Sequence, residues 1–182
     1  MCKERKEPLT HNSIAFFDAD KTLWKVIPEH EGDDWASKGA EKGLTRTFTL
    51  IKPDVVVRTE DNTQFILKEE VKETLLKLSR EGIGIGLISD NLHIDVLAIC
   101  ELFNIWDYFN AELVNVKLWD GPCPKDQMIT EVFGNNATVN PAKVVLVDDR
   151  NYSEEMTKLG YSFILSPKDT FPKEEIIEML LK

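Results

Sequence analysis

Short runs of apolar residues recur along the chain, and polar or turn-forming residues bound each of them. Runs of this length with polar boundaries are typical of strands that are buried on both faces of a sheet. The runs that we predict to be such strands are residues 13–18, Ile83–Ile88, Ala111–Lys117, Lys143–Val147 and Ser162–Leu165.

Segments with the spacing of amphipathic helices alternate with these runs. In the first of them, Val71, Leu75 and Leu78 fall on one helical face, and Gly82 follows as a stop signal. The predicted helices are Leu67–Arg80, Leu92–Phe103, Lys125–Phe133, Asn151–Leu159 and Lys173–Leu181. The alternation predicts an α/β fold, a Rossmann-like three-layer sandwich in which helices cover both faces of a central parallel sheet.

This pattern is interrupted between the first strand and the first helix. From Trp24 to about Asn62 prolines and glycines punctuate the chain, and only Thr47–Ile51 and Asp54–Arg58 look like strands. A structureless loop of this length is uncommon in a compact domain. We therefore expect a flap or small insertion at about residues 24–66, lying over the end of the first strand.

Length and composition indicate one globular domain. We place a polar tail at residues 1–12 and the domain at residues 13–182, which is long enough to bury a sizeable core. No apolar run approaches the ~20 residues of a membrane helix. With no secretory signal and three scattered cysteines, we expect a cytoplasmic protein. The net charge of −10 argues against nucleic acid as a partner.

Polar side chains follow three of the predicted strands at the points where the strands end. In a parallel sheet the carboxyl ends of the strands meet along one edge, so these side chains converge there. Carboxylates from two strands match a magnesium site, because Mg²⁺ prefers oxygen ligands. The converging residues are Asp18 and Asp20 after the first strand, Ser89 after the second, and Asp148 and Asp149 after a later one.

Three further donors fit a phosphoryl group beside that metal. Thr22 and Ser89 carry hydroxyl groups, and Lys125 begins a predicted helix and carries an ammonium group. The edge of the sheet therefore combines carboxylates for a metal with donors for a phosphate.

Four motifs carry a family resemblance. In chain order they are Asp18-Ala19-Asp20-Lys21-Thr22 after a strand, Ser89 after a strand, Lys125 near a helix start and Asp148-Asp149 after a strand. This series resembles the haloacid-dehalogenase superfamily of phosphohydrolases. The Thr-Leu-Trp ending of the first motif is similar to the branch of magnesium-dependent phosphatases known as subfamily IIIC.

The resemblance implies a catalytic mechanism and a metal site. Asp18 would be the nucleophile that forms an aspartyl-phosphate, and Asp20 would be the general acid and base. Mg²⁺ would bind Asp18, the backbone carbonyl of Asp20 and Asp149. Asp148 would orient these ligands or Lys125.

The resemblance also assigns residues to the phosphoryl oxygens. They would donate hydrogen bonds from side chains or backbone amides, and they are Ala19, Thr22, Ser89, Asp90 and Lys125.

Several positions depart from the superfamily pattern or have no assigned role. Lys21 stands where much of the superfamily has glycine, and Glu154 stands where some members have a second acidic ligand. The roles of Asn91 and His93, close behind Ser89, stay open. Trp24 is expected to pack in the core or to line the entrance of the site.

The implied function is Mg²⁺-dependent hydrolysis of phosphomonoesters, so we expect a phosphatase. The chain leaves no room for a large cap, so the site would be open to phosphorylated small molecules such as sugar phosphates, or to phosphoproteins. Two alternatives remain: carrier-protein-linked glyceryl or acyl transfer, and a phospho-accepting signalling domain. The sequence decides neither the substrate nor the oligomeric state.

Overall fold

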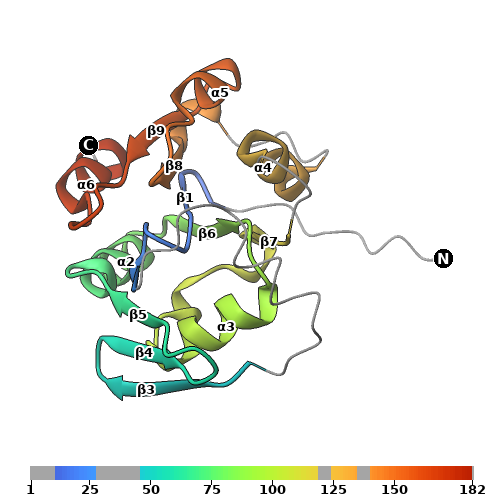
Figure 1. Ribbon diagram of the computed structural model, residues 1–182. Helices are drawn as coiled ribbons and strands as arrows, with labels where there is room; N and C mark the ends of the chain where they lie inside the picture. The colour runs from blue at the N-terminus through green and yellow to red at the C-terminus, as the bar shows by residue number, and fades with distance from the viewer. Residues whose placement is uncertain (1–10, 28–45, 119–123, 135–139, 182) are drawn as a thin grey trace.

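A five-stranded parallel sheet forms the centre of the computed structural model, which describes residues 11–27, 46–118, 124–134 and 140–181 (Figure 1). All neighbouring strands run in the same direction. In spatial order the strands are β7 (Val114–Val116), β6 (Gly84–Ser89), β1 (Ile14–Phe17), β8 (Val144–Asp148) and β9 (Ser162–Leu165). The predicted α/β fold with a central parallel sheet is confirmed.

Helices cover both faces of this sheet. They are α2 (Val71–Arg80), α3 (His93–Leu102), α4 (Lys125–Phe133), α5 (Ser153–Lys158) and α6 (Lys173–Leu181). Apolar residues of α2, α3 and α6 pack in one cluster with Ala15 and Phe17, while those of α4 and α5 pack in another with Ile14 and Phe16. Successive residues of β1 thus face opposite layers, which explains why the whole strand is apolar.

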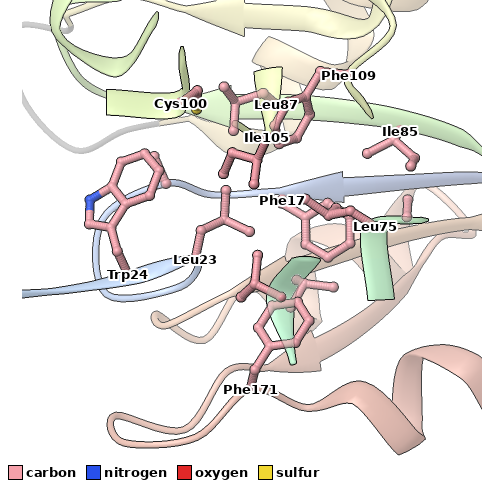
Figure 2. Packing of buried hydrophobic residues seen from close by; sticks show 14 of the residues in the cluster. Phe17, Leu23, Trp24, Leu75, Ile85, Leu87, Cys100, Ile105, Phe109 and Phe171 are labelled. Atoms are coloured by element: carbon pink, nitrogen blue, oxygen red, sulfur yellow. The ribbon is translucent and has the colours of Figure 1, made fainter. Parts of the chain in front are cut away.

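Phe17, the last residue of β1, packs in the larger of these two clusters, the one that contains α2, α3 and α6. Figure 2 shows Phe17 among Leu75, Leu87, Ile105 and neighbouring apolar side chains. In the sheet register Phe17 lies beside Leu87 of β6 and beside Val147 of β8. The residues that follow these three strands therefore reach the same edge.

A second, antiparallel sheet lies within the segment in which we expected a flap. Its strands, in spatial order, are β2 (Trp24–Ile27), β5 (Gln64–Leu67), β4 (Val55–Arg58) and β3 (Phe48–Lys52). Figure 1 shows β3 and β4 at the side of the molecule that carries α3. Residues 28–45 of the expected flap and most of the predicted polar tail lie outside the described residues.

Three predicted element boundaries were wrong. Leu67 is the last residue of β5, and a turn with Glu70 in the left-handed conformation (φ 68°) separates it from α2. The strand predicted from Ala111 begins at Val114, because Ala111–Leu113 form a short 3₁₀ helix. The helix predicted from Asn151 begins at Ser153, whose N–H donates to the Asn151 side chain. None of the helices in the described ranges is long and apolar enough to cross a membrane.

The turn between β4 and β5 is held by an ion pair between Arg58 and Asp61. Arg58 Nε donates to Asp61 Oδ1 at 2.9 Å, and the same oxygen accepts the Thr63 N–H at 3.0 Å. Arg58 is buried, whereas the Asp61 side chain is 44% exposed. The hydrogen bond from Arg58 is the main cause that holds the pKa of Asp61 below its ordinary value.

Asp61→Asn is expected to lower the free energy of unfolding at pH 7 by about 1 kcal/mol or less, since half-exposed ion pairs contribute little. Because the pKa of Asp61 is depressed in the folded state, this contribution is present above pH 3.8 and is lost as the pH falls below it. Urea unfolding at pH 7 and pH 3 measures the difference. Exposed Asp54 offers a control substitution, Asp54→Asn, and an Asp61→Asn deficit that is equal at both pH values would contradict the ion pair.

Candidate active site

The carboxyl ends of three neighbouring strands bring Asp18, Ser89 and Asp148 together. Each is almost fully buried, with exposed fractions of 7%, 2% and 1%. The Asp18 N–H continues the sheet by donating to the Val147 carbonyl at 3.0 Å. The convergence expected from the sequence thus occurs at the edge between β6, β1 and β8.

Lys125, the first residue of α4, lies between the carboxylates of two strands. Its Nζ donates to Asp18 Oδ1 at 2.6 Å and to the Ile88 carbonyl at 2.7 Å, and it lies 3.1 Å from Asp148 Oδ2. The lysine is 3% exposed. A buried ammonium in these contacts stabilises two buried carboxylates that would otherwise repel each other.

Three carboxylates form a cluster at this edge. Asp18, Asp148 and Asp149 each place one carboxylate oxygen within 4.8 Å of the others. Burial and the nearby Asp18 carboxylate raise the pKa of Asp149 above its ordinary value, and they raise the pKa of Asp148 in the same way. Lys21, Arg150 and Lys125 oppose the rise in the pKa of Asp149 but do not cancel it, so a further cation would be favourable here.

The two acids of the Asp148-Asp149 pair differ in their partners. Asp148 Oδ1 accepts the Arg150 N–H at 2.9 Å, and its Oδ2 faces Lys125. Within the described ranges the Asp149 carboxylate has neither a hydrogen bond nor an ion pair. This difference favours Asp149 as the ligand and Asp148 as the orienting residue, although that assignment stays a prediction.

Asp20 turns toward different partners from those of Asp18. Its Oδ1 accepts a hydrogen bond from Trp24 Nε1 at 2.6 Å, and its Oδ2 accepts one from Asn91 Nδ2 at 2.8 Å. Burial, and then the Asp18 carboxylate, raises the pKa of Asp20 to about 7. A carboxyl group with this pKa is available in both protonation states near neutral pH.

The tight turn after β1 contains the other residues of the first motif. Ala19 is fully buried and its carbonyl accepts the Leu23 N–H at 2.9 Å. Thr22 is also fully buried, and its Oγ1 has no hydrogen-bond partner in the part of the chain that the structure describes. Burying a hydroxyl group without a hydrogen bond costs free energy of folding, and a bound ligand that accepts or donates a hydrogen bond there would remove this cost.

Lys21 occupies the left-handed conformation in this turn, with φ 62°. That conformation costs a residue with a side chain about 1 kcal/mol relative to glycine, the residue that the superfamily pattern led us to expect at this position. The Lys21 side chain is exposed, and its charge opposes the rise in the pKa of both Asp20 and Asp149.

The remaining residues named from the sequence lie around this centre. Asp90 is half-buried in the loop that follows Ser89. His93 is exposed and packs edge-on against Trp106, with ring centroids 6.4 Å apart. Glu154 is exposed on α5 and is not part of the carboxylate cluster.

Sequence reasoning missed three contributions to the site. It treated Trp24 as a packing or entrance residue and left Asn91 open, yet both bind the Asp20 carboxylate. It did not consider Lys68, a buried residue whose Nζ donates to Ser166 Oγ at 3.1 Å and to the Pro167 carbonyl at 2.6 Å. Burial lowers the pKa of Lys68 to about 8, and the nearby Asp149 carboxylate opposes that effect. Of these three residues only Asn91 had a signal in the sequence, because it follows the predicted phosphate-binding residue Ser89 by two positions.

The model of the haloacid dehalogenase-like hydrolase family matches residues 37–162. The chain belongs to this family. The matched segment includes Ser89, Lys125 and Asp148-Asp149, and it begins after Asp18 and Asp20. A search of curated proteins finds no match.

Solved structures show the same fold at low sequence identity. A HAD-superfamily hydrolase from Ehrlichia chaffeensis is 13% identical with a TM-score of 0.59, covering 96% of this chain and 100% of that chain. The HAD domain of the effector protein Lem4 from Legionella pneumophila is 16% identical with a TM-score of 0.57, covering 93% and 94%. A mutant HAD-family enzyme from Bacteroides thetaiotaomicron, in complex with magnesium and inorganic phosphate, is 14% identical with a TM-score of 0.55, covering 90% and 98%.

Proposed function

We propose that this chain is a Mg²⁺-dependent phosphatase that forms an aspartyl-phosphate on Asp18. The observation that carries the proposal is the position of Lys125, whose ammonium bridges Asp18 and Asp148. Beside them lies the carboxylate of Asp149, which makes no hydrogen bond or ion pair with the residues that the structure describes. Family membership supports a hydrolase, and the Bacteroides neighbour that binds magnesium and phosphate supports this pair of ligands by analogy of fold.

The first half-reaction would use Asp18 and Asp20. Lys125 binds Asp18 Oδ1, which leaves Oδ2 to attack the phosphorus atom. As the new bond between Oδ2 and phosphorus forms, the bond from phosphorus to the ester oxygen breaks, and protonated Asp20 gives its proton to that oxygen. The raised pKa of Asp20 favours the protonated form that this step needs.

The second half-reaction would return both acids to their starting states. The Asp20 carboxylate takes a proton from a water molecule, whose oxygen attacks the phosphorus atom. The bond from phosphorus to Asp18 Oδ2 breaks, which releases inorganic phosphate and restores the Asp18 carboxylate. Asp20 ends protonated, as the next cycle requires.

Donors around Asp18 would bind the phosphoryl oxygens. Lys125 contributes a buried ammonium group, and Ser89 and Thr22 contribute buried hydroxyl groups. The Oγ1 of Thr22 fits this role, since a ligand would supply the hydrogen bond that it lacks among the described residues. The backbone amides of Ala19 and Asp90 would complete the set.

The residues present fit a magnesium ion. Asp18, Asp149 and the Asp20 carbonyl would hold it, and the close oxygens of the cluster give a net negative charge that suits a hard cation. When bound, Mg²⁺ supplies positive charge that offsets the repulsion between the Asp18 carboxylate and the phosphoryl group. Asp148 would orient Lys125 through their ion pair.

We further propose that the substrate is a phosphorylated small molecule or a phosphoprotein, and that the chain belongs to subfamily IIIC and acts in the cytoplasm. The Thr22-Leu23-Trp24 ending of the first motif supports the branch. The described part of the insertion is a four-stranded sheet rather than a separate helical domain, which supports an open site.

Removal of Mg²⁺ tests the metal part of the proposal. With p-nitrophenyl phosphate as substrate, EDTA is expected to lower turnover at least about 100-fold, and added Mg²⁺ to restore it. Mg²⁺ is also expected to raise the melting temperature of the protein, because it binds the folded state. Asp149→Asn should abolish that rise by removing a ligand.

Glu154→Gln is the matched control, since Glu154 is an exposed acid outside the carboxylate cluster. This variant should keep both the Mg²⁺-dependent turnover and the rise in melting temperature. Turnover that persists in EDTA, or a rise in melting temperature that survives Asp149→Asn, would contradict the proposed metal site.

A further inference from the structure

We propose that Asn91 is a positioning residue for the carboxyl group of Asp20, through which the loop after β6 aligns the proton-transfer group of the turn after β1. The inference rests on the proposed function, since it assumes that Asp20 transfers protons. It assigns a role to a residue for which the sequence suggested none.

The side-chain amide of Asn91 bridges a hydrogen-bond acceptor and a hydrogen-bond donor. Its Nδ2 donates to Asp20 Oδ2 at 2.8 Å, while its Oδ1 accepts the Leu92 N–H at 2.8 Å. A flipped amide would place oxygen against a carboxylate and nitrogen against an N–H, so only one orientation satisfies both contacts. Asn91 is 2% exposed, and water therefore has little access to replace either bond.

A second neutral donor holds the other oxygen of Asp20. Trp24 Nε1 donates to Asp20 Oδ1 at 2.6 Å, and the tryptophan is fully buried against Phe103, with ring centroids 6.0 Å apart. Figure 2 shows the indole at the end of the apolar cluster, with its nitrogen directed away from the other labelled side chains. The carboxyl group is thus fixed from two elements, β2 and the loop after β6.

This arrangement restricts the rotation of the Asp20 carboxyl group. Each oxygen has two lone pairs, so one on each oxygen remains for a proton after the two hydrogen bonds are made. Proton transfer requires the donor and acceptor atoms to approach to about 3 Å in a defined direction. A carboxyl group with only one fixed oxygen would sample other orientations, and fewer encounters would be productive.

The loop that contains Asn91 also connects two parts of the proposed reaction. Asn91 follows Ser89 by two residues, and Ser89 is the last residue of β6. The backbone that presents the Ser89 hydroxyl to a phosphoryl group therefore also sets the position of Asp20. Neutral donors suit this purpose, because they hold the carboxyl group without adding charge to the site.

The test compares two aryl phosphates that differ in leaving group but share the ring. Phenol is a poorer leaving group than p-nitrophenol, so phenyl phosphate depends more strongly on protonation by Asp20. We expect Asn91→Ser to lower kcat/KM for phenyl phosphate at least about tenfold more than for p-nitrophenyl phosphate. Serine retains an oxygen for the Leu92 N–H but is too short to reach Asp20.

Two further variants keep the test decisive. Trp24→Phe removes the other donor but retains an aromatic ring in the core. It should show the same selective loss, and it replaces Asn91→Ser as the test if that variant fails to fold. In the Asp20→Asn background, Asn91→Ser should cause no further loss of kcat/KM for phenyl phosphate, since there is no acid left to position. A merely structural role would give the same loss in both backgrounds.

Asn115→Ser is the matched control. Asn115 is a partly buried residue of β7 whose amide donates to the Met128 carbonyl and to Glu131, so the variant loses similar hydrogen bonds that do not involve Asp20. It should affect both esters equally.

Equal loss on both esters in Asn91→Ser, or additive loss with Asp20→Asn, would overturn the positioning role while leaving the phosphatase proposal intact. A wild-type protein without Mg²⁺-dependent turnover would overturn both.

Discussion

Asp18→Asn is expected to lower kcat for phosphate release by about 10⁴-fold or more, because an amide cannot attack phosphorus and no other carboxylate occupies its position. The substitution is isosteric, and the Asn side-chain oxygen can still accept the hydrogen bond from Lys125. The fold should therefore survive. The measurement is phosphate release from p-nitrophenyl phosphate with Mg²⁺, together with mass spectrometry of the acid-quenched protein.

The quenched wild-type protein should carry a phosphoryl group on Asp18 during turnover, and the variant should carry none. Asp107→Asn offers a control, since Asp107 is an exposed acid outside the site and its loss should leave turnover unchanged. An Asp18→Asn protein that remains active would disprove the covalent mechanism. Lasting phosphorylation of Asp18 in a wild type without turnover would instead favour a phospho-accepting signalling domain.

The position of the site could be predicted because it follows from local patterns and one rule of topology. Apolar runs located β1, β6 and β8 to within a few residues, and parallel pairing forces the ends of these strands to one edge. Lys125 could be placed because it begins a helix whose apolar face is evident in the sequence. The elements themselves follow from local sequence patterns, and the general rule for parallel sheets supplies the long-range pairing without knowledge of individual contacts.

Only half of the antiparallel sheet could be predicted in the same way. The runs Thr47–Ile51 and Asp54–Arg58 located β3 and β4, whereas β2 and β5 were missed. Trp24 pairs with Leu67, and Val26 pairs with Phe65, so β2 and β5 form only when two distant segments meet. Each strand has four residues, which is too short to give a decisive alternation. Leu67 fits the helical spacing of Val71 and Leu75 equally well, and strand pairing decides its conformation.

The contacts of Asp20 were beyond sequence reasoning for a related reason. Trp24 looked like a core residue, and it is one, but its ring nitrogen also reaches a carboxylate four residues earlier. Asn91 comes from a strand end far along the chain, and its amide has no sequence pattern that marks a partner. Strand topology brings these residues near each other, whereas the bonds between them depend on side-chain geometry.

Lys125→Met is expected to destabilise the Mg²⁺-free protein by about 3–5 kcal/mol, since it removes the cation from a buried ion-pair network. Methionine fills a similar volume, so packing should change little. The loss arises because the Asp18 and Asp148 carboxylates stay buried without the ammonium that lies 2.6 Å and 3.1 Å from them. Urea unfolding in EDTA measures the change.

Addition of Mg²⁺ distinguishes the contribution of Lys125 to stability from its contribution to activity. Mg²⁺ should recover part of the lost stability, because bound positive charge offsets the repulsion between the carboxylates. It should not recover activity, which is expected to stay at least about 100-fold below wild type, since the phosphoryl oxygens lack a donor. Lys143→Met, at an exposed lysine, is the control and should change stability by no more than about 0.5 kcal/mol.

A second substitution identifies the cause of the instability. If repulsion between buried carboxylates is responsible, Asp148→Asn should raise the stability of Lys125→Met, although Asp148→Asn alone should destabilise the wild type by removing an ion-pair partner. Activity should not return in the double variant, because the ammonium is still missing. If Asp148→Asn destabilises both backgrounds equally, the loss in Lys125→Met comes from packing, and the ion-pair network is not what holds α4 against the ends of β1 and β8.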